Sequence, residues 1–574
     1  MSRLIGMIFG TSPRGKETPL RSSEPALSSR AIPRQNVILA YLSSQLPAQL
    51  ISDRLAESLA RETGESVVLV RLNESDGSVS YMSPFDGKAT AVDWAPSEMM
   101  LQGQFGVPSN LLKTEAGFYR LILNVKNGSP APGSIAALMA SLDRHFRHVL
   151  VETVADVIEK SALVEFLTEA DLAYLFLPPA TEPIYRLDQL VREMEREHRP
   201  RNGKLKPIVC LAEGEAIDGF DLLIQRIAGP VHLFVRDYPG SPVQPTRDLF
   251  ARDIRRLARE AGGKLVGLAL SSGAAKGFAH IGVIQVLEEH GIEIDVVAGA
   301  SIGAYIGALW TFGFNGVELE ELARELEGRW GFWSLIDPVF PPRRGFLRGQ
   351  ALRRRLMRSI GSARFADLER PLRIVAGNLA TLDRTVLASG EIAASVHASM
   401  AVPGICVPVT LNGEAFIDGG IVDPVPVEVL QEMGVHRVIA VNAIPTPDRI
   451  RYAIQAEKEI ARSKEKPIKR WFRKALPLDS QLNYFARGNL FEIVMRSVHG
   501  AQVRLADASC RLADVILRPD ICDDRWLDCR NPRRFIALGR ESAERQLDSI
   551  KALAEGRNQS YEPEFAPETV AAIA

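Results

Sequence analysis

The chain has 574 residues, of which 46% are hydrophobic and 24% charged, a composition typical of globular proteins. This length predicts several domains. The net charge of −1 gives no basis for nucleic-acid binding, and five scattered cysteines without a C-x-x-C pair predict neither a disulfide framework nor a zinc site. We therefore expect a multidomain protein of the reducing cytosol that needs no metal and no cofactor.

The N-terminal half predicts a tail followed by an α/β region. Residues 1–35 carry six basic and two acidic side chains among Ser and Pro, which predicts a flexible basic tail. Between residues 36 and 262, short apolar segments predict a mostly parallel sheet covered by helices. The predicted strands are Val37–Leu42, Ser66–Leu72, Leu121–Val125, His148–Val154, Leu172–Leu177, Ile208–Leu211 and Val231–Val235.

The order of these segments resembles that of MinD/ParA-type nucleotide-binding domains. By this resemblance Val37–Leu42 is the first strand, and His148–Glu152 occupies the place of the Walker B strand. Residues Ser43–Leu50, where the phosphate loop would lie, contain no glycine to wrap phosphates and no lysine to neutralise them. We expect a degenerate P-loop-like domain that regulates or assembles and does not hydrolyse ATP.

A second motif begins at Leu265. The segments Leu265–Leu270, Ser271–Gly277 and Phe278–His290 indicate a strand, a small-residue loop and a helix. Backbone amides of such a loop, facing a helix N-terminus, can hold a phosphate or an oxyanion. No Walker sequence is present here, and a serine motif follows, so the oxyanion use is favoured.

The third motif is Gly299-Ala-Ser-Ile-Gly303, between the apolar run Asp295–Ala298 and the helix-compatible run Ala304–Trp310. A serine between two glycines at a strand-to-helix turn is typical of a nucleophile elbow, which exposes the hydroxyl at the start of a helix. The uncharged stretch Val296–Val317 is also long enough for a membrane span. Its dense Gly and Ser favour two short elements around an elbow instead.

The fourth motif, Phe416–Asp423, places Asp418 at the end of a short apolar strand, before Gly419 and Gly420. An Asp-Gly-Gly turn alone is common and carries little information. The small-residue block Ala398–Gly404 precedes it.

In this order, these blocks resemble the patatin-like phospholipases, with a neuropathy-target-esterase-like branch suggested by the region in front of them. The resemblance covers about residues 265–445 and implies a three-layer α/β/α catalytic domain over residues 264–450. It implies that Ser301 is the nucleophile and that Asp418 is its partner in a dyad without histidine. For His280 and His290 we therefore expect structural roles. The implied oxyanion donors are Gly273, Ala274, Ala275 and Ile302. The other implied motif positions are Ser272, Lys276, Gly277, Gly299, Gly303, Gly419 and Gly420.

The loop departs from the family pattern, which is usually a run of glycines with Arg or Lys before the last. Only Gly273 and Gly277 remain here, because Ser271, Ser272 and Ala274–Ala275 fill the other places. Ser and Ala resist a positive φ, which Gly adopts freely. The donors could therefore point differently, which leaves slow, narrowed or lost activity open.

Two basic stretches suit an anionic lipid surface. Between Asp337 and Asp367 the chain has eight arginines and no acid, with Leu352, Leu356 and Ile360 giving a helix in this stretch an apolar face. Residues Lys466–Lys474 place five cations around Trp471 and Phe472 within a predicted linker, 451–483. Residues 484–555 predict a helical extension of the catalytic domain, and 556–574 predict a loose tail.

The sequence thus predicts a cytoplasmic serine lipid acyl hydrolase, peripheral on the inner membrane surface, which cleaves phospholipid or lysophospholipid through an acyl-enzyme. Acyl transfer to another acceptor is the alternative within enzymes. The alternative from outside the enzymes is a catalytically weak scaffold that is recruited to membranes. Headgroup, chain length and oligomeric state are not predicted.

Overall fold

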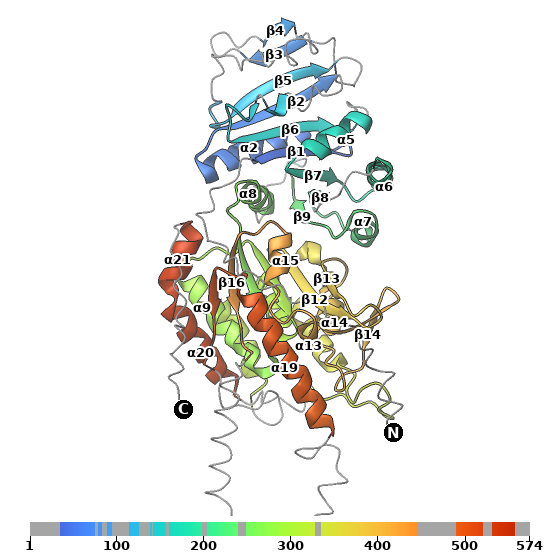
Figure 1. Ribbon diagram of the computed structural model, residues 1–574, viewed down its shortest axis with the longest axis vertical. Helices are drawn as coiled ribbons and strands as arrows, with labels where there is room; N and C mark the ends of the chain where they lie inside the picture. The colour runs from blue at the N-terminus through green and yellow to red at the C-terminus, as the bar shows by residue number, and fades with distance from the viewer. Residues whose placement is uncertain are drawn as a thin grey trace, which may run out of the picture. The chain divides into compact units, whose positions relative to one another are not determined.

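The computed structural model describes residues 35–74, 78–82, 89–93, 114–125, 138–140, 142–155, 160–197, 204–217, 219–238, 248–327, 335–444, 490–520 and 531–556. Two β-sheets with helices on both faces organise these residues (Figure 1). The predicted basic tail up to residue 34, the linker 451–483 with its basic stretch, and residues 557–574 lie outside the described residues.

The first sheet has the strand order β4-β3-β5-β2-β6-β1-β7-β8-β9. All strands from β5 to β9 along this order are parallel, and β3 and β4 are antiparallel additions at one edge. The mostly parallel α/β domain predicted for this region is confirmed. The strands are β1 (Gln35–Tyr41), β2 (Val67–Glu74), β3 (Ser78–Met82), β4 (Ala89–Asp93), β5 (Tyr119–Val125), β6 (His148–Val154), β7 (Leu172–Leu177), β8 (Leu205–Leu211) and β9 (Leu233–Arg236).

Helices cover both faces of this sheet. Apolar side chains of α2 (Ala48–Thr63) and α8 (Leu249–Ala261) pack on one face. Those of α5 (Lys160–Glu169), α6 (Thr181–Arg196) and α7 (Phe220–Ala228) pack on the other (Figure 1). The parallel strands are buried from both sides, which is why they read as continuous apolar runs in the sequence.

The carboxylate at the expected Walker B place is already neutralised within the protein. Glu152 of β6 accepts two hydrogen bonds from Arg71 of β2, both of 2.9 Å, and both side chains are buried. A bidentate guanidinium–carboxylate pair of this kind is among the stronger polar contacts in proteins.

The second sheet has the order β14-β15-β12-β11-β10-β16-β17, and β13 also pairs with β12. Strands β12, β11, β10, β16 and β17 are parallel. Strand β17 comes from the segment for which the sequence predicts helices, so this segment extends the sheet as well as covering it. The strands are β10 (Val266–Leu270), β11 (Val296–Ala300), β12 (Leu372–Asn378), β13 (Arg384–Leu387), β14 (Val409–Leu411), β15 (Glu414–Asp418), β16 (Arg437–Val441) and β17 (Val515–Leu517).

The helices around this sheet complete a three-layer α/β/α arrangement (Figure 1). Apolar residues of one group share the core on one face: α9 (Ala279–Glu289), α10 (Ile302–Phe312), α11 (Gly316–Arg324), α13 (Gln350–Ile360), α14 (Ile392–Ser399), α20 (Pro532–Arg545) and α21 (Leu547–Glu555). The other face is covered by α15 (Val427–Glu432) and α19 (Leu490–Cys510). Short 3-10 turns are η2 (Ala274–Phe278), η3 (Phe365–Asp367) and η4 (Gly419–Ile421).

The uncharged stretch 296–317 is not one long helix. It is β11, the turn at Ser301, α10 and the start of α11. Within the described ranges, no helix has both the length and the apolar character needed to cross a bilayer.

The arginine-rich stretch does form a helix, α13, but its apolar face is not available to lipid. Leu356 and Ile360 are buried in the core of the second sheet, and Leu352 packs against that core. This apolar face therefore cannot enter a membrane, whereas the expectation that the basic stretch suits an anionic lipid surface stays a prediction. An amphipathic pattern shows only that one face is buried, and here the protein itself buries it.

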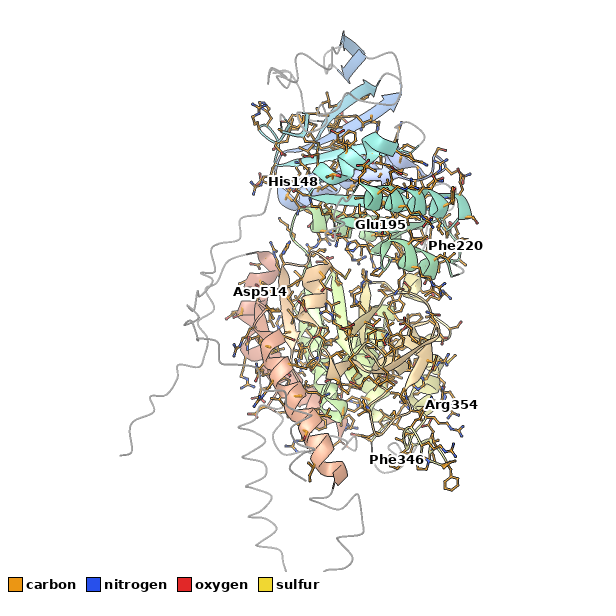
Figure 2. All side chains as sticks on the ribbon, turned by 45° about the vertical axis from the view of Figure 1, so that its right-hand side comes forward. His148, Glu195, Phe220, Phe346, Arg354 and Asp514 are labelled. Atoms are coloured by element: carbon orange, nitrogen blue, oxygen red, sulfur yellow. The ribbon has the colours of Figure 1, made fainter. Side chains whose placement is uncertain are left out.

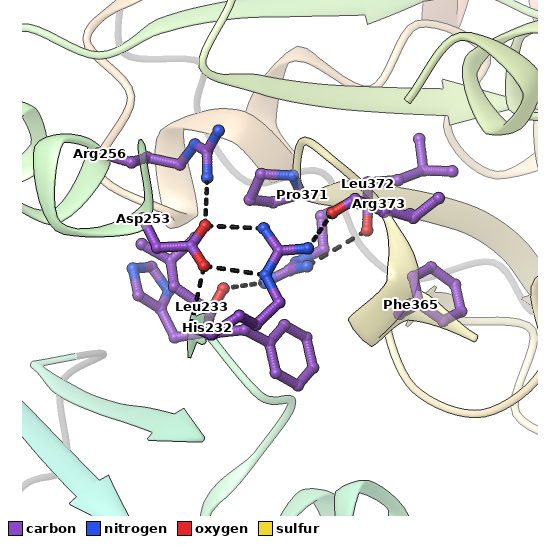
Figure 3. Close-up of a pocket in the computed structure, with 11 residues that line it drawn as sticks. His232, Leu233, Asp253, Arg256, Phe365, Pro371, Leu372 and Arg373 are labelled. Carbon is purple, nitrogen blue, oxygen red and sulfur yellow. Dashed lines mark hydrogen bonds and ion pairs between the residues drawn. The ribbon is translucent and has the colours of Figure 1, made fainter. Parts of the chain in front are cut away.

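Buried arginines join the two α/β domains through hydrogen bonds to backbone carbonyl oxygens. Asp253 of α8 accepts hydrogen bonds from Arg236 Nη2 (2.7 Å) and Nε (2.8 Å) and from Arg256 Nη1 (3.1 Å), as Figure 3 shows around a small pocket. Arg236 also donates to the carbonyl oxygens of Ala366 and Leu368 in the second domain.

Arg373, on β12, makes the reciprocal contact. Its Nη2 donates to the carbonyl oxygens of Val231 (2.9 Å) and His232 (2.6 Å), directly before β9. Burial lowers the pKa of Arg373 to about 10, so the guanidinium stays charged at neutral pH. The strand that supports the candidate site is thus tied directly to the first domain.

Replacing Asp253 by Ala should lower the free energy of unfolding by about 3–5 kcal/mol, because two buried guanidiniums lose their counter-ion. Glu289→Ala is the matched control, since it removes an exposed pair with Arg540 (2.7 Å) and should cost about 0–1 kcal/mol. Urea denaturation of the full chain, followed by tryptophan fluorescence, measures both. Equal losses of unfolding free energy in the two variants would show that this buried network stabilises the protein no more than an exposed ion pair does.

Candidate active site

The registers of β11 and β15 against β12 bring Ser301 and Asp418 together. Ala300, the last residue of β11, pairs with Val375, and Asp418 pairs with the next residue, Ala376. Strand β13 pairs with both residues of β12, so β11 and β15 must share the opposite edge. Strand β15 therefore pairs with this edge of β12 from the point where β11 ends. The side chain of its last residue, Asp418, lies next to Ser301, which follows Ala300.

The turn at Ser301 has the strained backbone of a nucleophile elbow. Ser301 has φ 54° and ψ −119°, between the end of β11 and the start of α10. A side chain at φ of this sign costs about 1–2 kcal/mol, so the packing around the turn must hold it. A Cβ at Gly299 would lie 2.7 Å from the Gly303 carbonyl, and one at Gly303 would lie 2.2 Å from the Leu270 carbonyl oxygen. Both motif glycines are thus required by close backbone approach.

The two functional groups are hydrogen-bonded and almost fully buried. Ser301 Oγ donates to Asp418 Oδ2 at 2.6 Å, and the residues are 6% and 2% exposed. The other carboxylate oxygen, Oδ1, accepts from the Gly420 amide at 2.7 Å. Burial raises the pKa of Asp418 to about 6, although both hydrogen bonds oppose this shift. The carboxylate is therefore ionised at neutral pH and more basic than an ordinary aspartate.

Glycine is also needed on the aspartate side. A Cβ at Gly419 would lie 2.0 Å from the Val375 carbonyl oxygen, and one at Gly420 would lie 2.5 Å from Ser272 Oγ. The Asp-Gly-Gly turn, a weak signal by itself, is thus sterically fixed against β12 and against the small-residue loop.

Ser399, at the end of α14, supports the elbow and was not singled out by sequence. Its hydroxyl accepts a hydrogen bond from the Ser301 amide (2.8 Å) and donates to the Val375 carbonyl (2.6 Å), and it is fully buried. It therefore bridges the two backbone groups at the point where β11 leaves β12. A hydroxyl inside the small-residue block Ala398–Gly404 was the only signal that could have pointed to it.

The small-residue loop lies against both of these turns. A Cβ at Gly277 would overlap the Ile302 side chain, at 2.2 Å from Cγ2. The loop is held by Ser271, whose hydroxyl donates to the Ser272 carbonyl (2.8 Å) and accepts from the Ala443 amide (2.9 Å). The loop, the elbow and the Asp-Gly-Gly turn therefore meet at one place.

The loop adopts a positive φ at Ala274 in spite of its side chain. Ala274 has φ 49° and, with Ala275 and Lys276, begins η2 after Gly273. The first amides of a helical turn have no partner within the turn, and the same holds for Ile302 at the start of α10. The positive φ of alanine here corresponds to local strain of about 1–2 kcal/mol.

Neither candidate histidine contacts the hydroxyl of Ser301. His280 is fully buried and its Nε2 bonds the Ser271 carbonyl oxygen at 2.9 Å, while burial lowers its pKa to about 4. It is therefore neutral and donates this bond. His290 is exposed at the end of α9. In the described part of the chain, no group of His, Cys, Asp and Glu is arranged to hold a metal ion.

Comparisons with known proteins find similarity in the region that contains this site. Residues 268–430 match the family described as patatin-like phospholipase. The lysophospholipase NTE1 of Kluyveromyces lactis is 27% identical over 47% of this chain and 18% of its own length. The lysophospholipase NTE1 of Cryptococcus neoformans is 30% identical over 41% of this chain and 15% of its own length. The chain thus spans less than a fifth of the length of these relatives.

Among solved structures, the MinD cell division protein of Aquifex aeolicus is similar over 39% of this chain and 95% of its own, with 14% identity and a TM-score of 0.30. The catalytic-type motifs all fall within the part matched by the family model. The C-terminal part of this chain therefore contains a patatin domain.

Proposed function

We propose that the patatin domain is a serine lipid acyl hydrolase of the phospholipase or lysophospholipase type. The observation that carries the proposal is the 2.6 Å hydrogen bond from a buried serine on a strained elbow to a buried carboxylate with a pKa of about 6. A serine hydroxyl is a weak nucleophile and needs an adjacent base. The names of the curated relatives support a lysophospholipid among the substrates.

In the proposed reaction, Asp418 takes the proton of Ser301 as Oγ attacks the ester carbonyl carbon. The tetrahedral oxyanion is stabilised by amides of the Gly273–Ala275 loop and of Ile302, where helix N-termini favour negative charge. Asp418 then returns the proton to the leaving alcohol, and the acyl group stays on Ser301. Water attacks this acyl-enzyme with Asp418 again as base. The bond between the acyl carbon and Ser301 Oγ then breaks, Asp418 returns the proton to Oγ, and the fatty acid is released.

The amide of Ser301 is an unsuitable oxyanion donor, since it already donates to Ser399. We infer that Ser399 is a positioning residue: it holds the elbow and does not touch the substrate. We infer likewise that neutral His280 positions the oxyanion loop through the Ser271 carbonyl.

We further propose the division of the chain into a regulatory or assembling domain at 36–262, the catalytic domain at 264–450 and its extension at 484–555. A cytoplasmic location fits Cys210, Cys406 and Cys510, which are free thiols. Binding to the inner surface of an anionic membrane fits a lipid substrate.

Ser301→Ala should abolish ester hydrolysis and covalent labelling by a fluorophosphonate, because no other hydroxyl replaces the nucleophile. Asp418→Asn should approach the same loss, since it keeps size and polarity but removes the base, and groups that act as one unit are not additive. His290→Gln is the matched control and should keep activity near wild type. Ester hydrolysis by Ser301→Ala at the wild-type rate would contradict the proposal. Labelling of the wild-type chain without ester turnover would favour the catalytically weak scaffold.

Ser399→Ala should slow fluorophosphonate labelling and kcat about tenfold, because the buried Ser301 amide loses its partner at a cost of about 1–3 kcal/mol. KM should change little, since no substrate contact is removed. Ser395→Ala, one turn earlier on α14, is the control, because among the described residues its hydroxyl bonds only the Glu391 carbonyl (3.2 Å). Equal effects of the two variants would show that Ser399 acts only on the stability of the helix.

A further inference from the structure

The segment Asp337–Arg348, here called the 337–348 loop, carries the most exposed large apolar side chain among the described residues. Phe340 is 94% exposed. Backbone pairing closes the loop below it, through a bridge between Pro338 and Leu347 and a 2.8 Å bond from the Val339 amide to the Phe346 carbonyl. Residues 340–345 therefore form the tip of a closed hairpin.

The base of this loop is fixed to the catalytic domain. The amides of Phe346 (2.8 Å) and Leu347 (2.9 Å) donate to the Ile405 carbonyl, and the Val407 amide donates back to the Leu347 carbonyl (2.9 Å). A Cβ at Gly345 would lie 2.5 Å from the Cys406 carbonyl carbon, so the contact is close. The exposed tip is thus presented by a rigid support.

A second fixed point lies where the loop enters α13. The Asp337 carboxylate accepts hydrogen bonds from the Gly349 amide (2.9 Å) and the Ala351 amide (2.8 Å), at the first turn of the helix. Figure 2 shows Phe346 of the loop and Arg354 of α13 at the same end of the patatin domain. The loop and the exposed face of α13 therefore form one surface.

This surface is rich in arginine. No Asp or Glu occurs from residue 338 to 366. Three arginines of the stretch are engaged within the protein: Arg353 with Glu391, Arg355 with Glu325 and Arg364 with Asp221. The other five are exposed and form no ion pair with any described residue: Arg343, Arg344, Arg348, Arg354 and Arg358.

The loop also stands next to the candidate active site. The Asp418 amide donates to the Ala401 carbonyl (2.9 Å), and the segment from Ala401 leads in a few residues to Ile405 and Cys406, on which the loop rests. The charges of Asp418 and Asp337 both help to raise the pKa of Cys406, in addition to its burial. A surface that binds this loop would therefore lie close to Ser301.

We propose that the 337–348 loop anchors the protein to anionic bilayers, with Phe340 entering the interfacial region and the five free arginines binding lipid phosphates. This inference rests on the proposed lipid hydrolase function. An aromatic ring is favoured at the boundary of headgroups and acyl chains, and guanidinium binds phosphate oxygens in pairs. One apolar group together with a basic cluster supplies the two signals that stable attachment needs.

Phe340→Ala should weaken binding of the full chain to vesicles of equal parts phosphatidylglycerol and phosphatidylcholine by about tenfold, as the burial of one aromatic side chain predicts. Tyr185→Ala is the matched control, because Tyr185 is also aromatic and is 60% exposed on α6 of the first α/β domain. Replacing Arg343 and Arg344 by Gln should weaken binding at low salt and reduce its salt dependence. Unchanged binding of Phe340→Ala, or no binding of the wild type to these vesicles at low salt, would overturn the proposal.

A second measurement reports insertion directly, even if another segment also binds lipid. The wild-type chain has six tryptophans, so the emission of Phe340→Trp is compared with that of the wild type. The added emission should shift to shorter wavelength on vesicles and be quenched by lipids with brominated acyl chains. Val317→Trp, at a 64% exposed position on α11 beside Glu318, is the control and should show neither change. If the protein binds vesicles but the added emission of Phe340→Trp neither shifts nor is quenched, the proposal is also overturned.

Failure of the anchor and failure of the proposed enzyme give different results. Phe340→Ala should hydrolyse a short-chain, water-soluble ester at the wild-type rate, because the substitution lies outside the catalytic machinery. Ser301→Ala should bind vesicles like wild type and hydrolyse nothing. Normal vesicle binding by Phe340→Ala rejects the anchor alone, whereas soluble-ester hydrolysis by Ser301→Ala rejects the proposed function alone.

Discussion

The hydrogen bond between Ser301 and Asp418 is the contact on which the rest of the catalytic domain depends. It joins residues 117 positions apart in sequence and requires three elements to end at one place. Strand β11 must stop at Ala300, β15 must take over the same edge of β12, and α10 must begin directly after Ser301. The glycines of the two turns follow from this requirement, because the backbones approach too closely for any Cβ.

The strain at the elbow is held by packing on all sides. Positive φ at Ser301 and at Ala274 together costs about 2–4 kcal/mol, which a marginally stable surface loop could not sustain. Ser399 fixes the first turn and Ser271 fixes the second, each by bonding two backbone groups. On the far side, Arg373 ties β12 to the first α/β domain through buried carbonyls. The first domain thus supports the strand from which the site is built.

Local patterns in the sequence predicted the parts of this arrangement but not their contacts. The strand, elbow and helix around Ser301, and the parallel strands such as Val37–Leu42, could be predicted because apolar runs and small-residue turns are local signals. The role of Ser399 could not, because it depends on the register between β11 and β12. The burial of the apolar face of α13 in the core could not be predicted either, since periodicity alone cannot distinguish a protein core from a membrane. The exposure of Phe340 is likewise a property of the folded loop and not of its sequence.

The measurement that tests the central claim most directly is the pH dependence of kcat/KM on a soluble ester, which reports the free enzyme's base. Asp418 acts only when deprotonated, so the rate should rise with pH to a plateau, with a midpoint near its pKa of about 6. The pKa of Asp423 is also about 6, through burial, but this group bonds Arg384, so Asp423→Asn should keep the midpoint. If the midpoint moves with Asp423 or with a histidine, or if Asp418→Asn keeps the wild-type profile, Asp418 is not the base.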